Sequence, residues 1–182
     1  MTFWILVAAI AGLLFGFPYI RFFIKRCLFR HRVKKLCRAK NWTITHRSRV
    51  SFLSGFRGPY FDLFIETAEI VYAVKLGGAV HRRNEYWFRN STQYAVKNMR
   101  FLIGIGGAQN VRYEEKAMPH YAAGGKLHRD KHAVPILLLN PMPGRCLYGN
   151  PPKLLTNGTQ LGELKIYSSG GLLKMLYEND SL

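Results

Sequence analysis

The chain begins with an uninterrupted apolar segment. Residues 3–20 read FWILVAAIAGLLFGFPYI, and no charged side chain occurs before position 21. A helix rises about 1.5 Å per residue, so this length matches the roughly 30 Å hydrocarbon core of a bilayer. The pattern predicts a transmembrane helix over residues 1–20. A cleaved signal peptide is the alternative, but no basic residue precedes the apolar run and no small-residue cleavage site ends it.

A basic segment follows over residues 21–40, here called the collar, and it has the period of a helix. It holds nine Lys and Arg residues, whereas none precedes the apolar segment. The positive-inside rule therefore predicts an N-terminus outside the cell and residues 41–182 in the cytoplasm. Some of its bases recur every four residues and should stack beside an apolar face. The stacked bases are Arg26, Arg30, Lys34 and Arg38, and the apolar face is Phe22, Phe29, Val33, Leu36 and Cys37.

The distribution of charge predicts a partner for the collar. The formal net charge is +17, and residues 1–61 contain 12 basic side chains and no acidic one. A basic residue near an anionic leaflet contributes about 1 kcal/mol of attraction, so we expect anionic lipid headgroups as the partner. In the alternatives, these bases only set the topology or bind nucleic acid. The helix of another membrane protein is a further possible partner, because Gly12 and Gly16 form a GxxxG pattern, which can pair helices within a bilayer. The predicted lipid- or anion-binding residues are Arg26, Arg30, Lys34, Lys35 and Arg38.

Residues 41–182 have the pattern of short strands separated by turns. Two pairs of apolar, β-branched runs flank tight turns and predict two hairpins. In the alternative for the second pair, the residues after Ser91 form a helix, because Ala95, Met99 and Leu102 fit helical spacing. A run of aliphatic residues, VPILLL, predicts a strand buried on both faces. The predicted strands are 61–67 with 70–76, 85–89 with 93–97, and then 134–139 and 164–167.

Helices and a further turn complete the predicted domain. Residues 170–177 predict a closing helix capped by Ser169, and residues 111–118 predict a short helical piece. The dipeptide Asn157-Gly158 is typical of a type I′ turn and predicts a hairpin within residues 154–161. The pattern as a whole is that of one mixed-sheet α/β domain.

The three cysteines predict thiols rather than disulfides. Cys27, Cys37 and Cys146 are an odd number in a chain too large to need covalent staples, which is typical of reduced thiols facing a cytosol. Cys27 lies close enough to the predicted span to be an acylation candidate, although a structural thiol is the preferred interpretation.

The first predicted hairpin contains the residues with the most specific chemistry. Asp62 opens one strand, and Lys75 lies on the next in the tripeptide Ala73-Val74-Lys75. In metal-dependent phosphodiesterases, carboxylates hold Mg²⁺ and a lysine steadies the attacking water or the phosphate. This order resembles the PD-(D/E)XK nucleases, and loosely their nuclease-related (NERD) branch, in which an Asp, a hairpin and a Glu-x-Lys tripeptide follow one another. The resemblance extends over about residues 41–177 and implies a restriction-endonuclease-like fold.

The tripeptide departs from that family at its acid. Ala73 stands where the family has a metal-binding Glu, and a single carboxylate holds catalytic Mg²⁺ poorly. The leading prediction is therefore a membrane-anchored, non-catalytic domain for binding or assembly, without a cofactor. In the alternative, a membrane-tethered nuclease or nucleic-acid-binding protein uses Asp62, Glu66, Lys75 and Mg²⁺. An ordinary hairpin with solvated Asp62 and Lys75 fits the sequence equally well.

His128 and His132 are weak candidates for metal ligands. Four residues apart on a helix, they could share an ion. On a strand they would lie about 13 Å apart, too far for one ion. Glycines before the pair and a predicted strand after it favour a polar loop.

Overall fold

The computed structural model describes residues 2–46, 61–80, 84–90, 93–97, 113–117 and 131–178. Within these ranges the chain forms helices and strands in an α/β arrangement, as the sequence predicts. The helices are α1 (Thr2–Ala39) and α2 (Ser169–Glu178). The strands are β1 (Thr43–His46), β2 (Leu63–Glu66), β3 (Ile70–Gly77), β4 (Glu85–Phe88), β5 (Gln93–Lys97), β6 (Tyr113–Ala117), β7 (His132–Leu139), β8 (Arg145–Tyr148), β9 (Lys153–Leu154), β10 (Thr159–Leu161) and β11 (Leu164–Ser168).

The strands form two mixed sheets. The first has the order β1-β2-β3-β7-β11-β10, and the second has the order β6-β5-β4-β8-β9. In the first sheet, β1, β2 and β3 form an antiparallel meander. The strand β7 lies between β3 and β11 and runs parallel to both. The carboxyl ends of β3 and β7 therefore meet at one edge of the sheet, which is the usual location of ligand sites in α/β folds.

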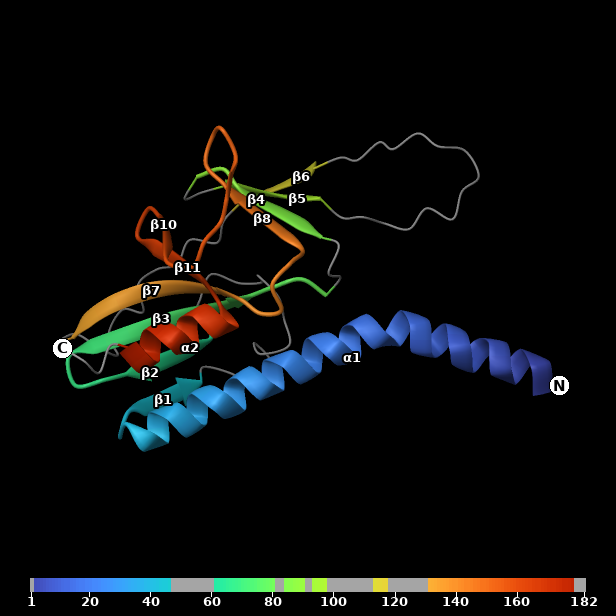
Figure 1. The fold of residues 1–182 in the computed structure, drawn as a ribbon, viewed down its shortest axis with the longest axis horizontal. Helices are drawn as coiled ribbons and strands as arrows, with labels where there is room; N and C mark the ends of the chain where they lie inside the picture. The colour runs from blue at the N-terminus through green and yellow to red at the C-terminus, as the bar shows by residue number, and fades with distance from the viewer. Residues whose placement is uncertain are drawn as a thin grey trace.

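Three layers result, with the first sheet in the middle. The helices α1 and α2 lie on one side of it and the second sheet lies on the other (Figure 1). A hydrophobic core lies on each face of the first sheet, and β7 contributes to both. Ile136 and Leu138 face the helices, while Leu137 and Leu139 face the second sheet. Burial on both faces explains why this strand is a continuous aliphatic run rather than an alternating one.

The second half of α1 is built into this domain. The predicted apolar face of the collar is confirmed: all five of its residues are buried, and four of them join the core between the helices and the first sheet. The helix ends where Asn41 adopts a left-handed conformation, with the Trp42 N–H donating to the carbonyl of Cys37. Lys40 Nζ then donates to the carbonyl oxygens of Leu176 and Tyr177, which ties the end of α1 to the end of α2.

The first half of α1 extends beyond the sheets (Figure 1). Several apolar side chains along it are exposed, among them Phe17, Tyr19 and Ile20. Among the helices of the described residues, none has both the length and the apolar character needed to cross a membrane. Within the predicted span, the structure describes the backbone but not the side chains at positions 3–6, 8–11 and 13–15.

Both predicted hairpins are confirmed. The strands β2 and β3 pair around residues 67–70, and β4 pairs with β5. The buried strand at 134–139 and the closing helix are confirmed as β7 and α2. The cap of α2, however, is Ser168, whose Oγ accepts the N–H of Gly171.

Two local predictions were wrong. The segment predicted as helical around residues 111–118 contains β6, which pairs with β5 and so gains a sheet partner that sequence propensity does not reveal. Residues 154–161 form no hairpin, because β9 pairs with β8 and β10 pairs with β11. A type I′ turn needs positive φ at both central residues, and in Asn157-Gly158 only Gly158 has it.

Candidate functional site

Asp62 and Lys75 come together in the interior of the protein. The register of the β2–β3 hairpin places Leu63 opposite Val74, so the residue before β2 faces Lys75. The Lys75 ammonium lies 3.5 Å from Oδ1 and 3.4 Å from Oδ2 of Asp62. The Leu76 N–H donates to Oδ2 at 2.8 Å. The side chains are only 1% and 4% exposed, so the pair is a buried ion pair rather than a solvated one.

Arg26 of α1 brings a second cation to this pair. Its side chain is fully buried, with Nε donating to the Asn140 carbonyl and Nη2 to the Gly77 carbonyl, both at 3.0 Å. The guanidinium also stacks 4.2 Å from the centre of the Phe22 ring. Burial lowers the pKa of Arg26 to about 10, against the opposing influence of Asp62. The guanidinium therefore joins the carboxyl ends of β3 and β7 to the helix, close to a carboxylate.

Tyr86, on β4 of the second sheet, covers these charged residues from the side of that sheet. Its hydroxyl donates to the Gly78 carbonyl at 3.0 Å, and burial raises the pKa of the phenol. Gly78 itself has φ of 136° and lies against the backbone of Asn140 and Pro141. We call Arg26, Asp62 and Lys75 the buried charge cluster.

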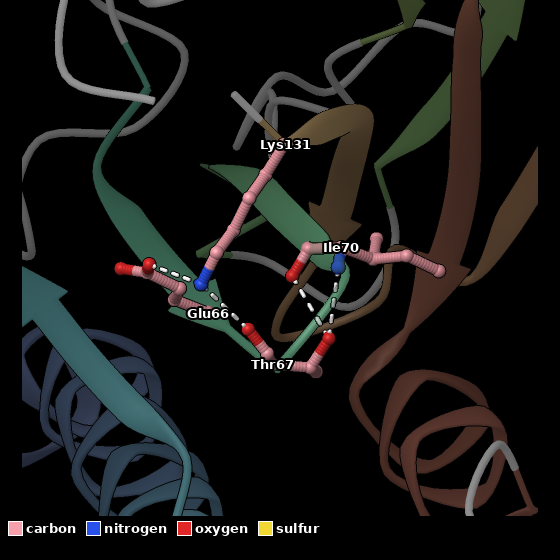
Figure 2. A network of polar contacts seen from close by, with 4 residues as sticks. All are labelled: Glu66, Thr67, Ile70 and Lys131. Atoms are coloured by element: carbon pink, nitrogen blue, oxygen red, sulfur yellow. Dashed lines mark hydrogen bonds and ion pairs between the residues drawn. The ribbon is translucent and has the colours of Figure 1, made fainter. Parts of the chain in front are cut away.

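Glu66, the second acid of the predicted nuclease site, is not part of this cluster. It lies at the other end of β2, where its Oε1 accepts a bond from Lys131 Nζ at 2.7 Å. Lys131 also donates to the Thr67 carbonyl, and the Thr67 hydroxyl closes the turn with Ile70 (Figure 2). Glu66 thus stabilises the hairpin turn.

The described residues offer little else for a metal ion. Glu85 lies on β4 in the second sheet, 3.9 Å from Arg145. Ala73 is buried on the same side of β3 as Lys75 and brings no oxygen ligand. His132 is exposed at the start of β7, and His128 lies outside the described residues. Across the ranges described above, no three His, Cys, Asp or Glu residues come together.

The predicted basic face of the collar is divided by the structure. Arg30, Lys34, Lys35 and Arg38 are exposed, as the prediction requires, whereas Arg26 is buried and is not available to a lipid. Four residues turn a helix by about 400°, so a series spaced by four drifts about 40° per step. The sequence already indicated that Arg26 lies on the buried face of the helix. It follows Phe22 by four residues and precedes Phe29 by three, and residues at these spacings share one helix face.

A cavity of about 610 Å³ opens beside the buried charge cluster. Side chains of α1 form one wall, the loop of residues 140–144 forms the second, and the start of α2 forms the third. Three of the wall residues are basic: Arg21, Lys25 and Arg32. The sequence placed all three in the collar but did not reveal the loop and the helix that form the other walls of the cavity.

Neither models of known protein families, nor curated proteins, nor solved structures match this chain. The assignment of a function therefore depends on the geometry of the site and on the chemistry of its residues.

Proposed function

We propose that this protein is a single-pass membrane protein whose cytoplasmic α/β domain has a nuclease-like core and acts in binding or assembly rather than in catalysis. One observation carries the proposal: both oxygens of the Asp62 carboxylate are already engaged inside the protein, by Lys75 and by the Leu76 N–H. This carboxylate acts as the counter-ion of the Lys75 ammonium in the interior of the protein.

The chemistry of phosphodiester cleavage supports this assignment. Carboxylates must neutralise Mg²⁺ and fix its geometry, and Ala73 provides none at the position where the nucleases that the sequence resembles have an acid. Two cations, Lys75 and Arg26, are close enough to influence Asp62, so a third positive charge at the same carboxylate would be repelled. The ligand set and the surrounding charge both disfavour a catalytic metal.

The nuclease-like part of the proposal is supported by the order of the elements. An Asp precedes β2, a hairpin follows, and a Lys lies on β3, beside which β7 runs parallel. The helix α2 closes the chain. This is the order of parts that the resemblance implies for residues 41–177.

Membrane attachment is supported by the sequence of residues 3–20 and by the side chains that follow. Phe17, Ile20, Phe23 and Ile24 on α1 are roughly half exposed or more, and they follow one another along the same helix. A run of exposed apolar residues, unlike single scattered ones, marks a site of interaction with lipid or protein. The excess of basic residues directly after position 20 supports the cytoplasmic location of the domain.

Catalysis is tested with the full chain in uncharged detergent, incubated with DNA or RNA and Mg²⁺ or Mn²⁺. We expect no metal-dependent cleavage by the wild type. Asp62→Asn and Lys75→Met serve as matched variants, each checked for folding by circular dichroism. Metal-dependent cleavage that the wild type performs and both folded variants lose would refute the proposal in favour of a tethered nuclease.

Topology is tested through Cys27, which is exposed on α1 shortly after the predicted span. Cys37 and Cys146 are buried, and burial raises the pKa of these thiols to about 11 and about 12, so both should react slowly. A membrane-impermeant maleimide should leave intact cells unlabelled and modify one thiol after permeabilisation, with Cys27→Ser as the control. Labelling of Cys27 in intact cells, or release of the protein by high salt alone, would contradict the assigned topology.

A further inference from the structure

The cavity beside the buried charge cluster has the size of a ligand site. Its volume of about 610 Å³ falls in the range of small-molecule pockets, roughly 300–1,000 Å³. It is lined by parts of the chain that are far apart in sequence, namely α1, the loop of residues 140–144 and the start of α2. Its residues take no part in the Asp62–Lys75 ion pair, so the site is independent of whether the domain cleaves phosphodiesters.

The charge of the cavity is positive, and the described residues do not compensate it. Arg21, Lys25 and Arg32 are separated by four and seven residues, which places them in one stripe along α1. The described residues that line the cavity include no acid. Within the described part of the chain, none of the three has an ion-pair partner. Three cations that converge on one cavity create a strong local preference for an anion.

The other walls fit the same kind of ligand. Ser169 and Gly170, the first residues of α2, line the cavity, and the first N–H groups of a helix have no carbonyl partners within the helix. The N–H of Gly171, the third residue, is occupied by the Ser168 hydroxyl. Beside these polar groups lie the apolar side chains of Leu28, Met142 and Leu173.

From these walls we infer that the cavity binds a phosphate monoester, held by Arg21, Lys25 and Arg32, with its organic part against Leu28 and Leu173. A phosphate monoester has a charge between about −1.5 and −2 at pH 7 and three strong acceptor oxygens, which suit guanidinium and ammonium donors. The phosphate can come from the headgroup of an anionic lipid or from a soluble metabolite. The location of the site on α1, where exposed apolar residues begin, suits the lipid source.

The experiment is calorimetric titration of the full chain in uncharged detergent. The probes are glycerol 3-phosphate, dihexanoyl phosphatidic acid and, as a zwitterionic control, dihexanoyl phosphatidylcholine. We expect phosphatidic acid to bind and phosphatidylcholine not to bind. If glycerol 3-phosphate binds equally well, the phosphate comes from a soluble ligand. If only phosphatidic acid binds, the phosphate comes from a lipid.

Matched variants separate a site from a diffuse positive surface. Lys25→Gln with Arg32→Gln removes two charges from the cavity, and Lys34→Gln with Arg38→Gln removes one Lys and one Arg from exposed positions of the same helix. At about 1 kcal/mol per basic residue, the cavity pair should weaken binding about thirtyfold, and the exposed pair should weaken it less than about threefold. Equal losses in the two double variants would overturn the inference, as would the absence of binding of both phosphate probes to the wild type.

A third variant leaves the three basic side chains in place. Ser169→Asp places a carboxylate in the cavity wall, where it should repel the phosphate and weaken binding at least about tenfold. An acidic residue in the first turn of a helix favours folding, so α2 should remain intact. Unchanged phosphate binding by this variant would also overturn the inference.

Discussion

The buried charge cluster predicts that Asp62 matters more to stability than either of the cations that surround it. Replacing Asp62 by Asn keeps the shape of the side chain and removes its charge. The variant would leave Lys75 and Arg26, which are 1% and 0% exposed, inside the protein without this carboxylate. Because burial of a charge without compensation is costly, the free energy of unfolding should fall substantially.

The magnitude follows from the distance. Two unit charges 3.4 Å apart attract by about 5 kcal/mol at an effective dielectric constant of about 20. Loss of one partner of a buried ion pair typically costs about 3–5 kcal/mol. We therefore expect Asp62→Asn to lower the free energy of unfolding by about 3–5 kcal/mol. That is a large part of the roughly 5–15 kcal/mol that stabilises an ordinary domain.

The reasoning is tested by a double-mutant cycle with Lys75→Met. Removal of the ammonium together with the carboxylate eliminates one of the buried cations, so the double variant should be more stable than Asp62→Asn alone. The interaction free energy should be about 2–3 kcal/mol. The assay is urea unfolding of the full chain in uncharged detergent, followed by tryptophan fluorescence. A cost below about 1 kcal/mol for Asp62→Asn, with additive effects in the double variant, would refute the argument.

Two further predictions concern the surroundings of the site. Gly78→Ala should lower the free energy of unfolding by at least about 2 kcal/mol, because an added Cβ would lie 2.6 Å from the Asn140 carbonyl and φ is 136°. Gly170→Ala, where an added Cβ meets nothing within 4 Å, should be neutral or slightly stabilising in the same urea experiment, and equal effects would contradict this account. Burial, with smaller contributions from Arg30 and Lys34, lowers the pKa of His46 from 6.5. Protonation of this imidazole is therefore less favourable in the folded state than in the unfolded state. The protein should therefore lose stability as the pH falls from about 7 through 6.5, and His46→Gln should flatten this dependence of the urea midpoint on pH. A wild-type midpoint that is unchanged or rises with acidification over that range would contradict the prediction.

The sequence alone determined the elements whose stabilising interactions are local. The hairpins at β2–β3 and β4–β5 were predictable because alternating β-branched and aromatic residues flank short polar turns. The buried character of β7 followed from its aliphatic run, and the buried face of the collar followed from helical spacing. The pairing of Asp62 with Lys75 also followed in outline, because a short turn sets the register of a hairpin.

Only the tertiary structure decided what surrounds that pair and which sheet each later strand joins. Arg26 lies on α1, 36 residues before Asp62 in the sequence, and no local pattern specifies that its guanidinium reaches the ends of β3 and β7. The strand β6 pairs with β5 instead of forming the helix that its sequence favours, and β10 pairs with β11 instead of pairing across the Asn157-Gly158 turn. In both cases pairing in a sheet outweighs the local propensity. The cavity likewise depends on the packing of α1, the loop after β7 and α2 against one another. Charges that appear in the sequence as one basic collar are thereby separated into a buried arginine, a cavity wall and an exposed face.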